Sequence, residues 1–234
     1  MDYPRPLIRA TLVQRYKRFL ADVKLENGET VTAHCANPGS MAGLKDPGLT
    51  VWLEPNDNPK RKLRYSWELA ELPDGNLVCV NTTMANKIVA EALHARKIPA
   101  LAPYPDIRPE VKYGQSSRID FLLRAKDLPD CYLEVKSVTL SRRPGLAEFP
   151  DSVTKRGTKH LQELAAMVAA GQRAVMLYLV QHSGAQRFTL ARDIDPAYAE
   201  AFAKARAAGV EVLCYATDLS HKGQSLAREL PLDI

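Results

Sequence analysis

The sequence predicts an α/β (α+β) protein in which a small N-terminal β-barrel precedes a larger unit built on a mixed sheet with helices on both faces. Two patterns carry this prediction. Residues 1–80 contain short strand-like runs separated by tight turns, whereas residues 81–234 mix helical segments with strand-like ones. The chain of 234 residues has room for one large domain or two small ones, and we place the boundary near residue 81.

Composition narrows the functional classes. A hydrophobic content of 46% and a charged content of 25% are typical of a globular protein with a buried core. No long apolar run follows the first residues or occurs elsewhere, so we expect no signal peptide and no membrane span. The four cysteines are dispersed without a CxxC pair, which favours reduced thiols in a cytoplasmic protein over a zinc site. A net charge of +5 suits nucleic acid or another polyanion without requiring it.

The N-terminal strands are predicted at residues 7–13, 18–25, 30–33, 49–53, 63–72 and 76–80. Asn27-Gly28 favours a hairpin turn of type I′, and Pro73-Asp74-Gly75 favours a second turn. Roughly five short strands with tight turns fit a barrel such as the OB-fold, which commonly binds single-stranded nucleic acid.

Two basic clusters in this half are interleaved with aromatic residues and are candidates for nucleic-acid binding. The first consists of Arg15, Lys17 and Arg18 beside Tyr16 and Phe19, and the second of Lys60, Arg61, Lys62 and Arg64 beside Tyr65 and Trp67. Such clusters neutralise phosphates and stack on bases. The alternative is a solvated loop next to core aromatics. The polar run at residues 34–41 invites a nucleophile interpretation, but no acid is placed to orient its histidine, so a structural turn is favoured.

Three helices are predicted after residue 81. The first covers residues 81–98 with Asn81 or Thr82 as cap, and Glu91 lies at the margin of its apolar face. The second begins with Asp151 or Ser152 as cap and ends at Gly171, with a buried stripe of Val153, Gly157, Leu161, Leu164, Ala165 and Val168. The third begins at Asp195-Pro196 and ends at residue 208. Strands are expected at residues 110–113, 174–180 and 210–215, with turns at 114–117 and a loop at 142–145.

The central feature is a hairpin of residues 118–123 and 131–139 around a Pro- and Asp-containing loop. Side chains alternate faces along a strand, so Glu134 and Lys136 share one face, and Asp120 points away from Ile119 and Phe121. A charge inside strands that otherwise look buried is costly unless it is paired or holds a metal.

The spacing Asp120-x13-Glu134-x-Lys136 resembles the active-site signature of the PD-(D/E)xK nuclease superfamily. The resemblance implies that Asp120 and Glu134 bind Mg²⁺ (or Mn²⁺) together with a main-chain carbonyl, and that Lys136 assists water activation. It also makes Glu91 a candidate third ligand, and Lys155, Lys159 and His160 candidates for contacting the substrate phosphate. The alternative is an ion pair on a half-exposed sheet, with Glu91 and the basic helix face solvated.

Four runs extend the resemblance to a family. HCANPGSM at residues 34–41, SRIDFL at 117–122, LEVKSVTL at 133–140 and FPDSVTKRG at 149–157 resemble the bacterial and archaeal sugar fermentation stimulation protein A family. The resemblance spans essentially the whole chain. It implies an OB-like DNA-binding domain at residues 1–80, a PD-(D/E)xK nuclease-like domain at 81–234, sequence-tolerant DNA binding and a regulatory role in maltose and sugar metabolism. Ile119, rather than proline, precedes Asp120.

Two interpretations of different classes stay open at this point. The first is a DNA-binding protein whose site cuts nucleic acid with Mg²⁺, and the second is a regulatory DNA-binding protein that keeps the nuclease fold without catalysis. Paired carboxylates repel phosphate unless a metal neutralises them, which favours the first. Single-stranded or structured DNA is the expected partner, RNA remains an alternative, and the sequence leaves the oligomeric state and the number of metal ions open.

Overall fold

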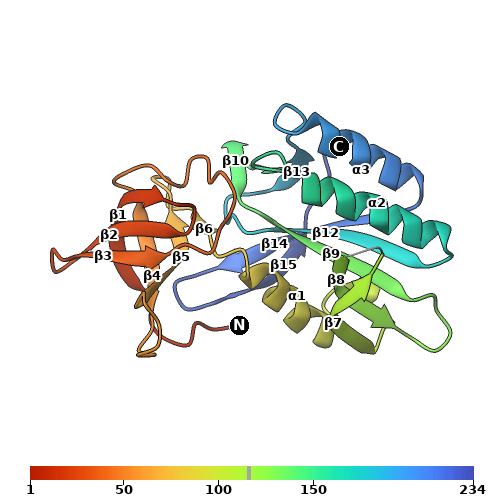
Figure 1. Ribbon diagram of the computed structural model, residues 1–234, viewed down its shortest axis with the longest axis horizontal. Helices are drawn as coiled ribbons and strands as arrows, with labels where there is room; N and C mark the ends of the chain where they lie inside the picture. Colours follow the sequence, from red (N-terminus) through yellow and green to blue (C-terminus); the bar gives the residue numbers. More distant parts are fainter. Residues whose placement is uncertain (115–116) are drawn as a thin grey trace.

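Two units lie side by side in the computed structural model, which describes residues 1–114 and 117–234 (Figure 1). A β-barrel lies at one end of the long axis. The other unit is a mixed sheet that carries α2 and α3 on one face and α1 on the opposite face. This is the α/β (α+β) arrangement that the sequence predicts. The predicted turn at residues 114–117 includes Gln115 and Ser116, which lie outside the described residues.

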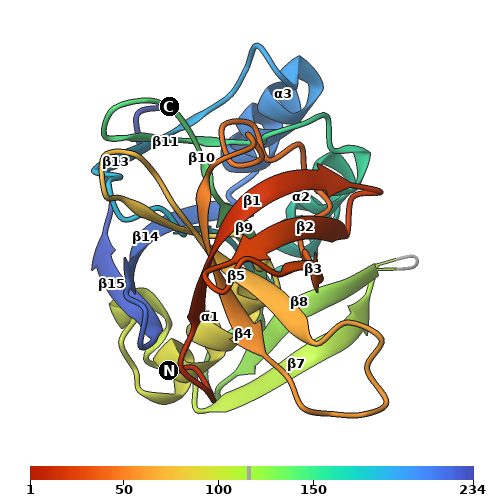
Figure 2. The same ribbon diagram turned by 90° about the vertical axis from the view of Figure 1, so that its left-hand side faces the viewer.

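The barrel is formed by β1 (Ile8–Tyr16), β2 (Leu20–Leu25), β3 (Thr30–His34), β4 (Thr50–Pro55) and β5 (Tyr65–Glu71), and β6 (Leu77–Cys79) extends the sheet beyond β5. Figure 2 views the molecule from this end. Antiparallel pairs run in the order β3-β2-β1-β4-β5, and a parallel contact between Ala33 and Tyr65 joins β3 to β5. That contact closes the sheet into the predicted OB-like barrel, around a core that includes Val23, Leu53 and Trp67.

Two barrel turns differ from the predicted ones. Only Gly28 has a positive φ, of 89°, in the β2–β3 turn, and its N–H donates to the Leu25 carbonyl. A type I′ turn needs two such residues, so that assignment was wrong. In the β1–β2 turn, Lys17 and Arg18 have φ of 47° and 63°. The predicted strand start at Arg18 was therefore also wrong, because the chain reverses there.

The second unit contains three helices among the described residues, α1 (Met84–His94), α2 (Lys155–Ala169) and α3 (Pro196–Ala207), and a 3₁₀ turn, η1 (Pro99–Leu101). Its strands are β7 (Asp106–Tyr113), β8 (Ser117–Arg124), β9 (Cys131–Val138), β10 (Leu140–Arg143), β11 (Leu146–Phe149), β12 (Arg173–Val180), β13 (Arg187–Leu190), β14 (Glu211–Leu219) and β15 (Gln224–Glu229).

The main sheet has the order β15-β14-β12-β9-β8-β7. Strand β12 lies between β9 and β14 and runs parallel to both, as its continuous apolar sequence predicts for a strand covered on both faces. A smaller sheet, β10-β11-β13, was not predicted. Of residues 142–145, expected to be a loop, only 144–145 form the turn of its hairpin, because Arg142 and Arg143 belong to β10. Arg142 is paired there with the buried Glu148 and with Asp193, which makes it part of the framework.

Two predicted helix boundaries differ from those in the structure. Helix α1 ends before the predicted residue 98 because Arg96 adopts a left-handed φ of 54°. Helix α2 is capped by Thr154, whose side chain accepts from the Gly157 N–H, and not by Asp151 or Ser152. Val153 was assigned to the buried stripe, yet it precedes the helix and is 68% exposed. The start of α3 is as predicted, with Asp195 accepting from the Tyr198 N–H.

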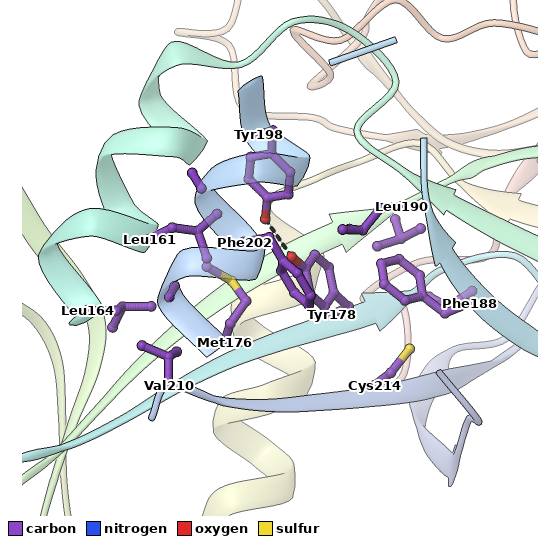
Figure 3. Close-up of a cluster of buried hydrophobic side chains, with 14 of the residues drawn as sticks. Leu161, Leu164, Met176, Tyr178, Phe188, Leu190, Tyr198, Phe202, Val210 and Cys214 are labelled. Atoms are coloured by element: carbon purple, nitrogen blue, oxygen red, sulfur yellow. Dashed lines mark hydrogen bonds between the residues drawn. The ribbon is translucent and has the colours of Figure 1, made fainter. Parts of the chain in front are cut away.

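Helices α2 and α3 cover one face of the sheet around a core of aromatic and aliphatic side chains (Figure 3). The hydroxyls of Tyr178 on β12 and Tyr198 on α3 lie 2.5 Å apart at its centre. A second core lies under α1 on the opposite face. In the described ranges, no helix has both the length and the apolar character needed to cross a membrane.

Candidate active site

The β8–β9 hairpin separates at the point where the predicted site begins. The two strands pair from Leu123 and Cys131 to Phe121 and Leu133, and the pairing ends there. Beyond it, the Oδ2 atom of Asp120 accepts a hydrogen bond of 2.7 Å from the N–H of Val135. The carboxylate therefore satisfies a backbone donor that the diverging strands leave unpaired.

The regular alternation of side chains is also interrupted at Asp120. Ile119 packs under α2 and α3, whereas Phe121 packs on the α1 side, so these two neighbours lie on different faces. The expectation that they share a face was wrong. The opposing residue on β7, Glu110, has a φ of 54°, so both strands are irregular at the same level. This irregularity lets Asp120 turn toward β9.

Asp120 is also held by α1. The side-chain amide of Asn86 donates to its Oδ1 atom at 2.7 Å, so both carboxylate oxygens have a fixed partner. Burial, and after it the negative charge of Glu134, raises the pKa of Asp120 to about 6. A cation placed beside Asp120 would relieve both effects.

Glu134 is the most deeply buried group of the site, with 2% of its surface exposed. Its Oε1 atom accepts from Lys136 Nζ at 2.7 Å and contacts Nδ1 of His160. Burial acts to raise the pKa of Glu134, but the hydrogen bond to His160 and the Lys136 cation outweigh it, and the pKa is lowered. The Oε2 atom is buried and has no hydrogen-bond partner among the residues that the structure describes.

His160 is more buried than the sequence indicated. It was assigned to the solvent side of α2, as a candidate phosphate contact, but only 3% of its surface is exposed. Its Nε2 atom accepts from Nε of Arg156 at 3.3 Å, so the network assigns the ring proton to Nδ1, facing Glu134. His160 thus orients the carboxylate of Glu134.

These residues line a pocket of about 650 Å³ between the two units. Asp120, Glu134, Lys136 and His160 line it from the sheet and α2, and the turn of residues 37–39 lines it from the barrel. Arg15 holds that turn by donating to the Asn37 and Gly39 carbonyls, at 2.8 and 3.1 Å. Residues 37–39 therefore form a structural turn, and the ring of His34, at the end of β3, stacks on that of Phe19.

A short contact fixes the turn to the second unit. The Ser40 hydroxyl donates to the Asp151 carbonyl at 2.7 Å, and the Met41 N–H donates to the Asp151 carboxylate at 3.1 Å. We call these two bonds the latch. Asp151 also lines the pocket, so the latch determines how closely the barrel approaches the site.

The structure does not bring Glu91 to this pocket. Its side chain lies on α1, 48% exposed, and pairs with the Met1 amino group at 3.3 Å. Asn86, one turn and a half closer to the start of α1, makes the contact with Asp120 instead. An uncharged residue in the first turns of a helix gives no sequence signal for such a role.

The predicted nucleic-acid-binding residues fall into separate groups. Lys17 and Arg18 are exposed at the β1–β2 turn, and the segment between β4 and β5 exposes Lys60, Arg61, Lys62 and Arg64. Arg15 is partly buried and holds the turn described above. On α2, Lys155 and Lys159 are exposed, and Lys159 lies 3.6 Å from Glu163. The barrel groups do not line the site pocket.

The donor set suits a hard divalent cation. The described residues contain no group of three or more His, Cys, Asp and Glu side chains arranged to hold a metal. Mg²⁺, however, is commonly bound by one or two carboxylates and several waters. The buried, unpartnered Oε2 of Glu134 is an oxygen that lacks a donor, and a cation would compensate it. The residues present therefore fit such an ion.

Comparisons with known proteins agree with this architecture. Residues 83–223 match the family described as "Sugar fermentation stimulation protein RE domain", and residues 13–80 match the "SfsA N-terminal OB domain". A sugar fermentation stimulation protein homolog of Ruegeria sp. (strain TM1040) is 60% identical over 99% of this chain and 100% of its own length. The Ruegeria pomeroyi homolog is 60% identical over 97% of this chain and 99% of its own length.

A solved structure extends the agreement to three dimensions. The structure of Pyrococcus furiosus SfsA in complex with Ca²⁺ superimposes with a TM-score of 0.90 at 25% sequence identity, covering 100% of this chain and 98% of the other. Both units are included in the superposition. The chain therefore belongs to the sugar fermentation stimulation protein family.

Proposed function

We propose that this protein binds nucleic acid, with DNA as its main partner, and hydrolyses phosphodiester bonds with a divalent cation. The observation that carries the proposal is the convergence of Asp120, Glu134 and Lys136 on one pocket, with the Oε2 atom of Glu134 buried and unpartnered in the described part of the chain. A protein that only binds DNA gains nothing from two buried carboxylates, because they repel phosphate.

Support for the cation comes from two sources. The ligand atoms are carboxylate oxygens, which Mg²⁺, Mn²⁺ and Ca²⁺ all accept. The similar Pyrococcus furiosus protein is a complex with Ca²⁺, and we extend divalent-cation binding to this chain on that basis. When bound, such an ion polarises a phosphoryl oxygen and lowers the pKa of a coordinated water.

The residues of the pocket have distinct roles in this proposal. Asn86 and the Val135 N–H fix the orientation of Asp120, and His160 fixes that of Glu134. Lys136 lies 2.7 Å from Glu134 and lines the pocket, so its ammonium is placed to hold the attacking water or to neutralise the phosphate. Asp120 and Glu134 would hold the divalent cation.

Nucleic-acid binding is proposed from charge and architecture. The net charge is +5, and an OB-like barrel stands beside the pocket. The exposed residues Lys17 and Arg18, together with the basic segment between β4 and β5, can neutralise a phosphate backbone outside the site. The proposed regulatory role in sugar metabolism rests on the family resemblance alone.

The test is a cleavage assay on single-stranded, duplex and structured DNA and on RNA, each with Mg²⁺, Mn²⁺ or chelator. We expect metal-dependent cutting that Asp120→Asn and Lys136→Ala each reduce by at least about a hundredfold, as loss of a transition-state contact predicts. Glu91→Gln is the matched control, because that carboxylate is exposed and away from the pocket.

Binding without cutting, unchanged in the variants, would contradict the catalytic part and favour the alternative of a non-catalytic regulatory protein. Loss of DNA affinity on adding Mg²⁺ would argue against the metal site, since the cation should relieve the repulsion between the carboxylates and phosphate.

A further inference from the structure

A second cavity, of about 350 Å³, adjoins the candidate active site. It is lined by Glu110, Ser117, Arg118, Arg156, Lys159 and His160. Three of these, Glu110, Arg156 and His160, also line the site pocket, so the two cavities are adjacent. A ligand longer than the reacting group can therefore extend from the site pocket toward the second cavity.

The wall of this cavity is predominantly cationic. Arg118 and Arg156 contribute two positive charges against the single carboxylate of Glu110, and Lys159 adds a third that Glu163 partly balances at 3.6 Å. Arg118 and Arg156 form no ion pair with another residue in the described ranges. Other arginines of the central sheet do, such as Arg124 with Asp130 and Arg173 with Glu211. Unpaired guanidinium groups beside a cavity match the planar, two-pronged recognition of phosphate.

The positions of the arginines relate the cavity to the site. Arg118 lies two residues before Asp120 on β8, and Arg156 lies one helical turn before His160 on α2. Arg156 donates through Nε to His160, which leaves its terminal N–H groups for a ligand. A polynucleotide bound with one phosphate at the carboxylates must place its next phosphate close by, and this cavity is the neighbouring basic space.

We propose that the cavity between β8 and α2 is a phosphate subsite, in which Arg118 and Arg156 bind the phosphodiester next to the one at Asp120 and Glu134. The inference rests on the proposed function and adds to it a defined contact outside the reacting group. Lys159 adds positive charge to the cavity wall, whereas the carboxylate of Glu110 repels the bound phosphate. The subsite makes substrate binding depend on at least two consecutive phosphates.

The test measures binding of a fluorescent single-stranded DNA oligonucleotide by anisotropy, with Ca²⁺ present, over a series of salt concentrations. Arg118→Ala and Arg156→Ala should each weaken binding about tenfold, as loss of a charge-assisted hydrogen bond predicts. The double variant Arg118→Ala/Arg156→Ala should reduce the slope of log K against log salt by about 0.7, the value for one phosphate contact on a single strand, and each single variant should reduce it by less. Arg192→Ala is the matched control, since Arg192 is exposed and lines neither cavity.

A second arm locates the phosphate. Oligonucleotides with one neutral methylphosphonate at successive positions are bound to the unchanged protein and to the double variant Arg118→Ala/Arg156→Ala. One position should weaken binding by the unchanged protein and have no further effect in the double variant. Glu110→Gln should tighten binding, because it removes the opposing charge. Thermal unfolding of each variant checks that it is folded.

The outcomes separate the two proposals. If the unchanged protein binds no oligonucleotide, the proposed function fails and the subsite fails with it. If it binds, but the arginine variants keep its affinity and salt slope, the subsite is overturned and nucleic-acid binding stands. Weaker binding in Glu110→Gln would also overturn the subsite, because it would indicate a cavity for cations.

Discussion

Individual buried acids in this protein differ mainly in the partner that each one finds. Glu148 and Glu68 are both 2% exposed. Arg142 forms hydrogen bonds with both oxygens of Glu148, and these bonds hold the pKa of Glu148 below its usual value. Glu68 has only the neutral amide of Asn81 as its hydrogen-bond donor among the described residues, so burial raises the pKa of Glu68 to about 7. The same side chain is thus a stabilising ion in one place and a costly one in the other.

Glu68 should therefore make stability fall as pH rises. Its folded pKa lies above its unfolded value of 4.5, so the native state binds the extra proton between about pH 4.5 and 7. The extra proton on Glu68 stabilises the native state fully below about pH 4.5, and this contribution is lost above about pH 7. It amounts to about 3 kcal/mol, since each unit of pKa shift corresponds to about 1.36 kcal/mol.

We expect Glu68→Gln to be more stable than the unchanged protein at pH 8 and closer to it at pH 5, measured by urea unfolding. Glu29→Gln, an exposed acid of the same barrel, serves as the control. An advantage of Glu68→Gln that is equal at both pH values would contradict the assignment.

At the scale of elements, α2 is the helix that connects packing with the site. Its first turn is capped by Thr154, and its stripe packs on the sheet and on α3. His160 projects from this stripe to Glu134. At 3.6 residues per turn, residue 160 lies about 60° from Gly157 on the side away from Leu161, so periodicity alone leaves it off the predicted stripe. The sequence prediction therefore placed His160 off the stripe, as a candidate phosphate contact or a solvated side chain. Its burial depends on Glu134, a partner that lies on a distant strand.

Gly157 sets the distance between α2 and α3. A Cβ at this position would lie 3.0 Å from the ring of Tyr198 and 2.9 Å from Thr154. Tyr198 is fully buried and bonded to Tyr178, so the ring has little room to move. Gly157→Ala should therefore destabilise the protein by about 1–2 kcal/mol, because overpacking exceeds the gain in helix propensity.

The matched control for Gly157→Ala is Ala166→Gly on the exposed face of the same helix, which should cost about 1 kcal/mol through propensity alone. Chemical denaturation of both variants checks this. Stabilisation by Gly157→Ala would show that the contact with Tyr198 relaxes freely.

At the scale of the whole molecule, the site depends on how the barrel is held against the α/β unit. The latch between residues 40–41 and Asp151 lies next to the pocket. A second contact stacks His221, from the β14–β15 turn, on Trp52 of the barrel, with ring centroids 3.7 Å apart. Both contacts join residues remote in sequence, and together they fix the orientation of the barrel.

Gly39 tests the latch. A Cβ at this position would lie 2.3 Å from the Asp151 carboxylate, so Gly39→Ala should open the latch and lower the unfolding temperature. The same substitution in an Asp151→Ala background should cost much less, because the clash is gone, and a double-mutant cycle of thermal unfolding measures the difference. Equal costs in both backgrounds would show that Gly39 acts through its own backbone and not through the latch.

The sequence by itself determined the main strands and helices, the OB-like barrel and the family, because periodicity, turn residues and linked motifs are local features. It also identified the residue types of the candidate site. Only the tertiary structure decided which side chains meet. It placed Asn86 on Asp120, buried His160 against Glu134, and left Glu91 in solvent beside Met1. Those outcomes depend on where α1 and α2 lie against the sheet, and packing between elements distant in sequence leaves no local pattern.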